Sequence, residues 1–209
     1  MEIVKYSIEG KNIGKLSLPK EIFSVHSKNF NQIQYEVINT YLTNQRIGSA
    51  NVKFRSEIHG SRKKLYKQKG TGNARVGDKK TVLRRGGGRA FGPKPKNWYS
   101  KITKKKKRIA LKLALSQLAD NKKVFIIEDL NFDIASTKKA KTILNALNFE
   151  GRKKLILIDS SDKNIVKSFN NIKNTDLGRA DSIYPYQILK TDCLIMTESA
   201  FKKIGEVYK

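Results

Sequence analysis

The sequence predicts an α/β fold: a three-layer, Rossmann-like domain with a mainly parallel sheet, plus a long extended basic loop. Two observations lead to this prediction. In most of the chain, short continuous apolar runs alternate with segments of helical periodicity, as expected for strands covered on both faces by helices. Residues 48–100 follow no regular period and carry much of the positive charge. We therefore expect 1–209 to form a single α/β domain, with 48–100 inserted as a loop between two helices.

The first elements are predicted from short local patterns. Residues 3–6 and 15–18 are separated by a glycine-containing turn and predict a small hairpin. Apolar residues at helical spacing predict an amphipathic helix over about 30–46. After the loop, the spacing of leucines and alanines predicts a second helix around 111–118.

The second half of the chain has the clearest pattern. Two apolar runs, 124–127 and 155–158, are separated by a helical segment around 140–147. This is one βαβ unit, which requires parallel strands and a right-handed crossover. The remaining expected elements are a helix around 165–172, a buried strand at 194–196 and a closing helix around 200–207.

The charge is extreme and unevenly distributed. The chain has 44 Lys and Arg against 18 Asp and Glu, a formal net charge of +26. Residues 53–108 contain 21 of those cations and only two acids, Glu57 and Asp78, which gives +19 and leaves +7 for all other residues. Such an excess opposes compaction and indicates a polyanionic partner, most often nucleic acid.

An anionic membrane surface is the rival partner, but it explains less. Interfacial binding needs an amphipathic helix with a basic face, and the apolar face of the helix after 104–108 is better explained by packing on the sheet. The N-terminus lacks a signal-peptide core, and no apolar run approaches spanning length. The lone Cys193, in an apolar run, fits a reducing compartment and a buried, inert thiol. We expect a cytoplasmic protein with no membrane contact.

Three features of the loop favour RNA binding over a solvated, disordered linker. Glycine clusters at 70–72 and 86–88 allow close backbone approach and positive φ. Cations are available along nearly the whole segment, and four aromatics (Tyr66, Phe91, Trp98 and Tyr99) are interleaved as base-stacking platforms would be. The residues predicted to bind RNA are Lys53, Arg55, Arg62, Lys63, Lys64, Tyr66, Lys67, Lys69, Arg75, Lys79, Lys80, Arg84, Arg85, Arg89, Lys94, Lys96, Trp98, Lys105 and Arg108. The loop buries too little apolar surface to order itself, so we expect it to be mobile until it meets its partner.

A catalytic function has little support in the sequence. Neither glycine cluster continues into a P-loop or a dinucleotide fingerprint. With only His26 and His59, no zinc site or His-based triad can be built, and we predict no catalytic residue, cofactor or metal. Acids that follow predicted strands are Glu128, Asp129, Asp159 and Asp162. Caps and turns explain such acids more often, and Asp162 is expected to cap a helix. An RNA-binding regulator, or an RNA-processing enzyme that uses these acids, remains the alternative.

Several loop motifs together resemble the bacterial ribosomal protein L-four family, the fourth protein of the large subunit. They are the stretches 67–75 (KQKGTGNAR), 85–88 (RGGG), 91–95 (FGPKP) and 105–116. The resemblance continues through the βαβ unit to the C-terminus. The sequence departs from the commoner family pattern at Leu65-Tyr66, at Asn73 and over 78–84.

The resemblance implies a structural protein of the large ribosomal subunit. Its globular domain would bind 23S ribosomal RNA early in assembly, and the tip of its loop would form part of the nascent-peptide exit tunnel. The residues implied at this tip are Lys69, Gly70, Thr71, Gly72, Asn73, Ala74 and Arg75. The implied partners are 23S rRNA, neighbouring large-subunit proteins and the nascent peptide, and no homo-oligomer is expected. The implied location is the cytoplasm, bound to the ribosome.

Overall fold

The chain folds as two compact units. The computed structural model describes residues 2–147, 149 and 151–208. One unit, here called the body, contains residues up to Leu42 and from Lys101 onward. The other, here called the loop unit, spans Thr43–Ser100.

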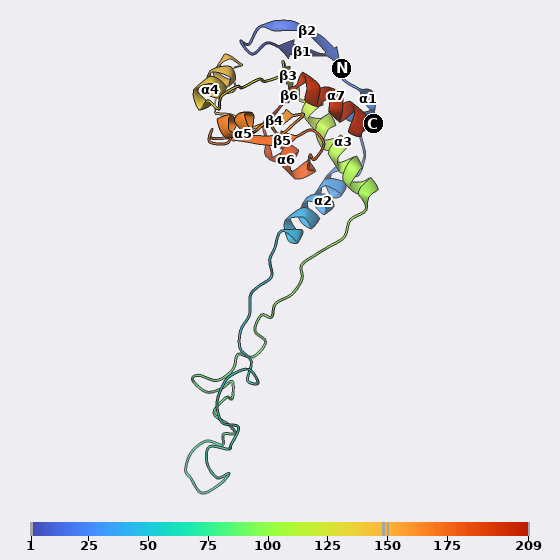
Figure 1. The fold of residues 1–209 in the computed structure, drawn as a ribbon. Coiled ribbons are helices and arrows are strands. Elements are labelled where there is room, and N and C mark those ends of the chain that lie inside the picture. The colour runs from blue at the N-terminus through green and yellow to red at the C-terminus, as the bar shows by residue number, and fades with distance from the viewer. Residues whose placement is uncertain (1, 148, 150, 209) are drawn as a thin grey trace. The chain divides into compact units, whose positions relative to one another are not determined.

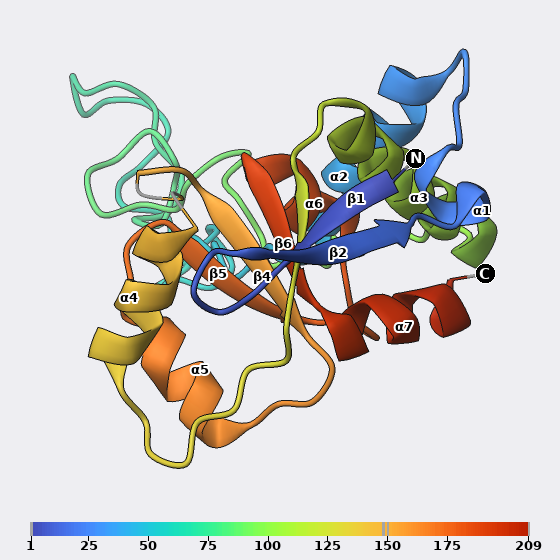
Figure 2. The ribbon, with the colours of Figure 1, turned by 90° about the horizontal axis from the view of Figure 1, so that it is seen from above.

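The body is built on a six-stranded mixed sheet (Figures 1 and 2). Its strands are β1 (Glu2–Tyr6), β2 (Asn12–Ser17), β3 (Val124–Ile127), β4 (Lys154–Ile158), β5 (Thr175–Arg179) and β6 (Cys193–Thr197). They are arranged in the order β2-β1-β3-β6-β4-β5. Only β1 and β2 pair antiparallel, and all other neighbours are parallel. The predicted hairpin, the three apolar strands and the mainly parallel sheet are therefore confirmed.

Helices cover both faces of this sheet. They are α1 (Lys20–Phe23), α2 (Phe30–Asn44), α3 (Lys104–Asp120), α4 (Thr137–Ala146), α5 (Lys163–Phe169), α6 (Pro185–Lys190) and α7 (Glu198–Val207). Residues of α1, α3, α6 and α7 share one apolar cluster with Leu155 and Leu157 of β4. Residues of α4 and α5 share a second cluster with Ile156 and Ile158. Successive side chains of a strand point to opposite faces, so the unbroken apolar run of β4 supplies both clusters.

The connection between β3 and β4 passes through α4, as predicted, but these two strands are not neighbours. β6 lies between them and pairs with both. The order therefore differs from that of dinucleotide-binding sheets, whose strands wind outward in sequence from a central first strand. The body is an α/β domain with a mixed, mostly parallel sheet.

Helix starts in the body follow the expected capping chemistry. Asp162 caps α5, and its carboxylate accepts a hydrogen bond from the backbone N–H of Asn164 at 3.1 Å. This confirms the capping interpretation of that acid. Thr197 caps α7 and accepts from the N–H of Ala200 at 3.3 Å. Such side chains satisfy backbone donors that have no partner inside the helix.

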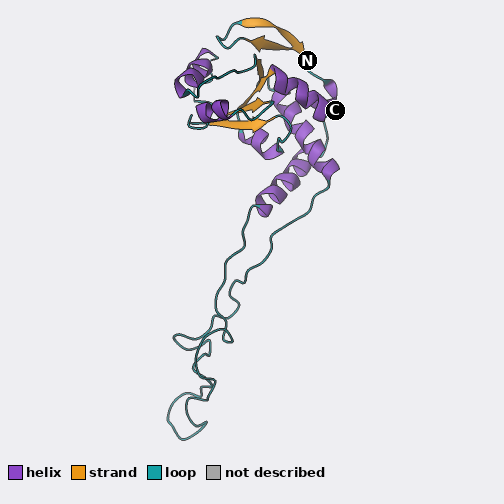
Figure 3. Ribbon diagram, viewed as in Figure 1, coloured by secondary structure: helices purple, strands orange, loops and turns teal. Residues whose placement is uncertain are grey.

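The loop unit contains no strand or helix beyond the end of α2 in the part that the structure describes (Figure 3). No apolar side chain in it is buried: its only buried residues are Lys80 and Gly88. Its order must come from other contacts.

Candidate nucleic-acid interface

Hydrogen bonds organise the loop unit as a series of closures, nested as far as the bond between Lys53 and Arg89, which encloses two separate smaller loops. At its base, the amide of Asn44 donates to the carbonyl of Ser100 at 3.0 Å and accepts from the N–H of Ser100 at 2.7 Å. Further along, the backbone pairs are Lys96 N–H to Gly48 O (3.2 Å), Val52 N–H to Pro93 O (3.2 Å), Arg89 N–H to Lys53 O (3.0 Å), Gly88 N–H to Lys80 O (3.0 Å) and Leu65 N–H to Gly77 O (3.1 Å). The segment is thus irregular but internally cross-linked, which the absence of a period did not predict.

One of these two smaller loops contains the stretch that the sequence assigned to the loop tip. The bond between Leu65 and Gly77, together with that from the Tyr66 hydroxyl to the Ala74 carbonyl, encloses residues 69–75. Gly70 and Gly72 have φ of +81° and +66°, and nothing lies within 4 Å of a Cβ built on either. Their conformation favours glycine, while the space around them is open to a partner.

The 86–88 glycines have a different role from the one expected. A Cβ on Gly87 would lie 1.9 Å from the carbonyl oxygen of Thr81, and one on Gly88 would lie 2.3 Å from the nitrogen of Arg55. These two glycines let the chain pack against itself, whereas the sequence interpretation had them approaching a phosphate chain. Gly86, with φ of +79° and open space, still fits the earlier expectation.

The loop unit presents a dense positive surface. Residues 43–100 contain 16 Lys and Arg against two acids. Within the described residues, only Lys94 has an ion-pair partner, Glu57. The hydrogen bond from Lys94, followed by one from the backbone N–H of Phe54, holds the pKa of the Glu57 carboxyl below its usual range. The remaining cations have no ion-pair partner among the described residues and repel one another, as expected for a surface that binds an anion.

Most of the predicted RNA-binding residues of the loop unit are exposed, but a few are not. Lys80 is only 8% exposed, and Lys94 is partly covered by its ion pair with Glu57. The side chain of Lys80 lies close to Gly60: a Cβ built on Gly60 would be 3.6 Å from the Cε of Lys80. Lys80 therefore differs from the other cations of the set, because its stem packs inside the unit.

Two aromatics of the predicted set are already engaged by the chain itself. The ring of Trp98 has the guanidinium carbon of Arg46 at 3.6 Å and the ammonium of Lys96 at 3.7 Å from its centroid. Such cation–π contacts stabilise the packing of the ring. Arg46, which the sequence interpretation missed, carries no motif signal. Tyr66 is partly buried, and its hydroxyl donates to Ala74.

Cations also gather at the start of α3, in the body. Lys104–Arg108 occupy its first turn, which has no acid, and the predicted Lys105 and Arg108 are exposed. Lys106 instead pairs with Glu36 of α2. Positive charge at a helix N-terminus opposes the helix dipole, so Lys105 and Arg108, which have no ion-pair partner among the described residues, do not stabilise α3. They are available to an external anion.

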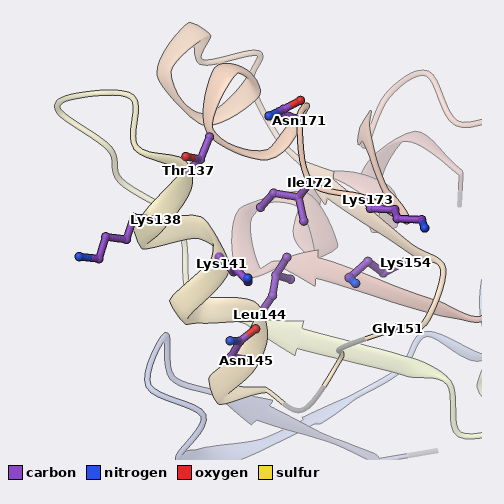
Figure 4. A pocket seen from close by; sticks show the side chains of 10 residues that line it. All are labelled: Thr137, Lys138, Lys141, Leu144, Asn145, Gly151, Lys154, Asn171, Ile172 and Lys173. Carbon is purple, nitrogen blue, oxygen red and sulfur yellow. The ribbon is translucent and has the colours of Figure 1, made fainter.

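A further basic hollow lies in the body (Figure 4). Its volume is about 700 Å³, and its lining is Thr137, Lys138, Lys141, Leu144, Asn145, Gly151, Lys154, Asn171, Ile172 and Lys173. Lys141 and Lys154 lie on facing sides, whereas the side chain of Lys138 points away. Lys154 is buried and donates to the carbonyls of Phe149 and Arg152 at 2.9 and 3.1 Å. Sequence reasoning missed Lys173, because it did not find the turn between α5 and β5.

Three of the four strand-end acids, Asp129, Asp159 and Asp162, are occupied by structural contacts. Asp129 accepts from the backbone N–H and the hydroxyl of Ser199, at 3.0 and 2.7 Å. Asp159 forms an ion pair with Lys203 at 2.7 Å. In the part of the chain that the structure describes, no group of three or more His, Cys, Asp or Glu side chains is placed to hold a metal ion.

Two further observations concern the membrane and the thiol. No helix among the described residues is long and apolar enough to span a bilayer. Cys193 is buried in β6, and desolvation raises the pKa of its thiol, as expected for an inert side chain.

The fold and this surface define a class: a basic α/β protein with a long, cross-linked, cation-rich loop, in which three of the four strand-end acids make structural contacts. A profile of the Ribosomal protein L4/L1 family matches residues 16–207. The chain belongs to this family, which confirms the resemblance seen in its loop motifs.

Curated relatives match over nearly their full length. The chain is 38% identical to the Large ribosomal subunit protein uL4 of Christiangramia forsetii over 98% of each chain. It is 38% identical to the protein of that name from Porphyromonas gingivalis over 100% of each chain. Identity to the Desulforapulum autotrophicum protein is 40%, over 93% of this chain and 92% of the relative.

Proposed function

We propose that this protein is a structural constituent of the large ribosomal subunit that binds 23S rRNA and catalyses no reaction. Membership of the L4/L1 family supports the assignment to the ribosome. The observation that carries the RNA-binding role is the loop unit, in which 15 of the 16 cations have no ion-pair partner among the described residues. The contacts of Asp129 and Asp159 favour this role over that of a processing enzyme.

Binding would be driven by phosphate neutralisation and the release of counterions. If about ten cations engage phosphates, the logarithm of affinity should fall by roughly 0.7–0.9 per contact for each log unit of salt. RNA would also supply the order that the loop unit cannot obtain from a core of its own. We therefore still expect residues 50–100 to be protease-sensitive in RNA-free protein and protected in the complex.

The tip, Lys69–Arg75, is proposed to line the nascent-peptide exit tunnel. Gly70 and Gly72 keep its surface free of bulk, and Lys69 and Arg75 are exposed. In this location the tip would meet the nascent peptide and neighbouring large-subunit proteins. The protein would act as a single copy, bound to cytoplasmic ribosomes.

For the body, we propose that the basic hollow beside α4 and the first turn of α3 contribute additional phosphate contacts. Lys141 and Lys173 supply exposed ammonium groups at the hollow, and Asn145 and Asn171 supply side-chain amides. Lysines and amides are the groups that protein surfaces use to hold an RNA backbone in register. This arrangement would let the body bind RNA before the loop unit is ordered.

Ribosome sedimentation tests the proposed function. Tagged full-length protein should co-migrate stoichiometrically with the large subunit, and a variant in which residues 54–88 are replaced by a short Gly-Ser linker should do so poorly. This replacement keeps Lys53 and Arg89, whose backbone hydrogen bond joins the two ends of the replaced segment. A matched control with Lys11→Gln, an exposed lysine of the β1–β2 turn, should behave as wild type. Absence of the wild-type protein from large subunits would overturn the proposal.

A further inference from the structure

Phe91 is the most exposed of the described aromatics in the loop unit, ahead of Tyr99, which is 69% exposed. Trp98 and Phe54 have cations over their rings, with Lys94 Nζ 4.2 Å from the centroid of Phe54. Phe91 is 104% exposed, and within the described residues no ring or cation stacks on it. It is thus an apolar ring held entirely in solvent, in a unit dominated by charge.

The backbone at Phe91 is also unusual. Its φ is +49°, one of three positive values among the described non-glycine residues. A bulky side chain in this left-handed region is disfavoured, because its Cβ crowds the following carbonyl. Because the ring is fully exposed, no packing contact of the ring among the described residues offsets this strain.

The neighbouring chain holds this conformation in place from both sides. Before Phe91, the N–H of Arg89 donates to the carbonyl of Lys53 at 3.0 Å. After it, the N–H of Val52 donates to the carbonyl of Pro93 at 3.2 Å. Gly92 packs closely on Val52: a Cβ built on Gly92 would lie 2.0 Å from the Cγ2 of Val52. Residues 90–92 therefore form a short turn that is held against residues 52–53 by these contacts, and the Phe91 ring points into solvent.

We propose that Phe91 is a base-stacking residue, whose ring lies against an unpaired base of the bound RNA. This inference rests on the proposed function and assigns to one residue a role that the sequence had left shared among four aromatics. The charge beside the ring identifies the partner: the Cγ of Arg89 would lie 3.2 Å from a Cβ built on Gly92, and Arg89 is exposed with no ion-pair partner among the described residues. An apolar protein pocket closing over Phe91 would desolvate the Arg89 guanidinium, whereas RNA supplies a phosphate for it and a π-face for the ring.

The test measures binding of the full-length protein to 23S rRNA across a series of salt concentrations. Phe91→Gly is the main variant, because glycine accepts the positive φ and so removes the ring without straining the turn. Stacking on one base contributes about 1–3 kcal/mol, so affinity should fall about 5- to 150-fold. The slope against salt should not change, because no phosphate contact is lost.

Three further variants make the result specific. Phe91→Tyr keeps a stacking ring and should bind within a few-fold of wild type. Leu83→Ala removes an aliphatic side chain that is 93% exposed in the same unit and should have no effect. Arg89→Gln should instead reduce the salt slope by about 0.7–0.9, as expected for a lost phosphate contact.

The outcomes separate this inference from the function on which it rests. If wild-type protein binds rRNA with a steep salt slope and Phe91→Gly binds equally well, the stacking role is wrong and the proposed function stands. The stacking role is also wrong if Phe91→Gly binds rRNA normally but fails to enter large subunits, since the ring would then contact a protein. If wild-type protein does not bind rRNA at all, the proposed function itself fails.

Discussion

Gly88→Ala should weaken RNA binding while leaving the stability of the body unchanged. The added Cβ would lie 2.3 Å from the backbone nitrogen of Arg55 and 2.7 Å from its Cα. These are backbone atoms, so no side-chain rotation relieves the clash, and the two segments must separate. Separation breaks the bonds from Gly88 to Lys80 and from Arg89 to Lys53, both 3.0 Å.

The size of the effect follows from those two bonds. Each backbone hydrogen bond contributes about 0.5–1.5 kcal/mol, so about 1–3 kcal/mol is lost from the cross-linked arrangement. Because RNA is expected to bind this arrangement, its affinity should fall about 5- to 150-fold. The thermal midpoint of the body should not move, since neither apolar cluster contains a residue of 43–100.

Gly77→Ala is the matched control. It lies in the same unit, has no left-handed φ, and nothing lies within 4 Å of its built Cβ. Filter binding to 23S rRNA and a thermal melt of each variant provide the two measurements. If Gly88→Ala and Gly77→Ala bind RNA equally well, the close packing of residues 54–55 on 88 does not matter for binding, and the reasoning is refuted.

Three further predictions concern the body. Lys105→Glu should raise the free energy of unfolding by about 0.3–1 kcal/mol, because a negative charge interacts favourably with a helix N-terminus, and should weaken RNA binding. Denaturant titration measures the first effect and filter binding the second. A loss of stability would contradict the prediction. Hydrogen bonds, first from Lys5 and then from Lys202, lower the pKa of Glu198 from 4.5 to about 2. A depressed carboxyl pKa adds stability that is present above about pH 4.5 and lost as pH falls towards 2, so Glu198→Gln should flatten acid unfolding over that range. Solvent screening at this partly exposed pair limits the effect to about 1 kcal/mol. Thr197→Ala should cost about 1 kcal/mol in urea unfolding by removing the cap of α7, and an unchanged midpoint would show that Ala200 N–H finds another acceptor.

The body could be predicted from sequence because burial leaves a local signal. The runs 124–127, 155–158 and 194–196 are apolar on both faces, and each became a central strand. β5 was missed because it is an edge strand of mixed polarity, TDLGR, with no apolar run. The short helices α1 and α6 have too few turns to show a period.

In the loop unit, composition predicted the chemistry but not the arrangement. Cross-links such as Gly48 to Lys96 join residues far apart in sequence and leave no periodic pattern. For the same reason, the packing of Lys80 and the cations over Trp98 could not be foreseen. Glycine was expected where a ligand comes close, yet at Gly88 the close neighbour is the chain itself. A glycine cluster shows that something comes close to the backbone, and only the structure shows what it is.

The two units obtain their order from different sources. The body has two apolar clusters, one on each side of its sheet, so burial stabilises it without a partner. The loop unit buries no apolar side chain, and its many unpaired cations repel one another. Most of its side-chain hydrogen bonds are exposed to water, and each contributes little by itself. An anion that neutralises the cations removes the main opposing force and excludes water from those bonds at the same time. The charge that makes the free loop unit weakly ordered is therefore the same charge that makes its order depend on RNA.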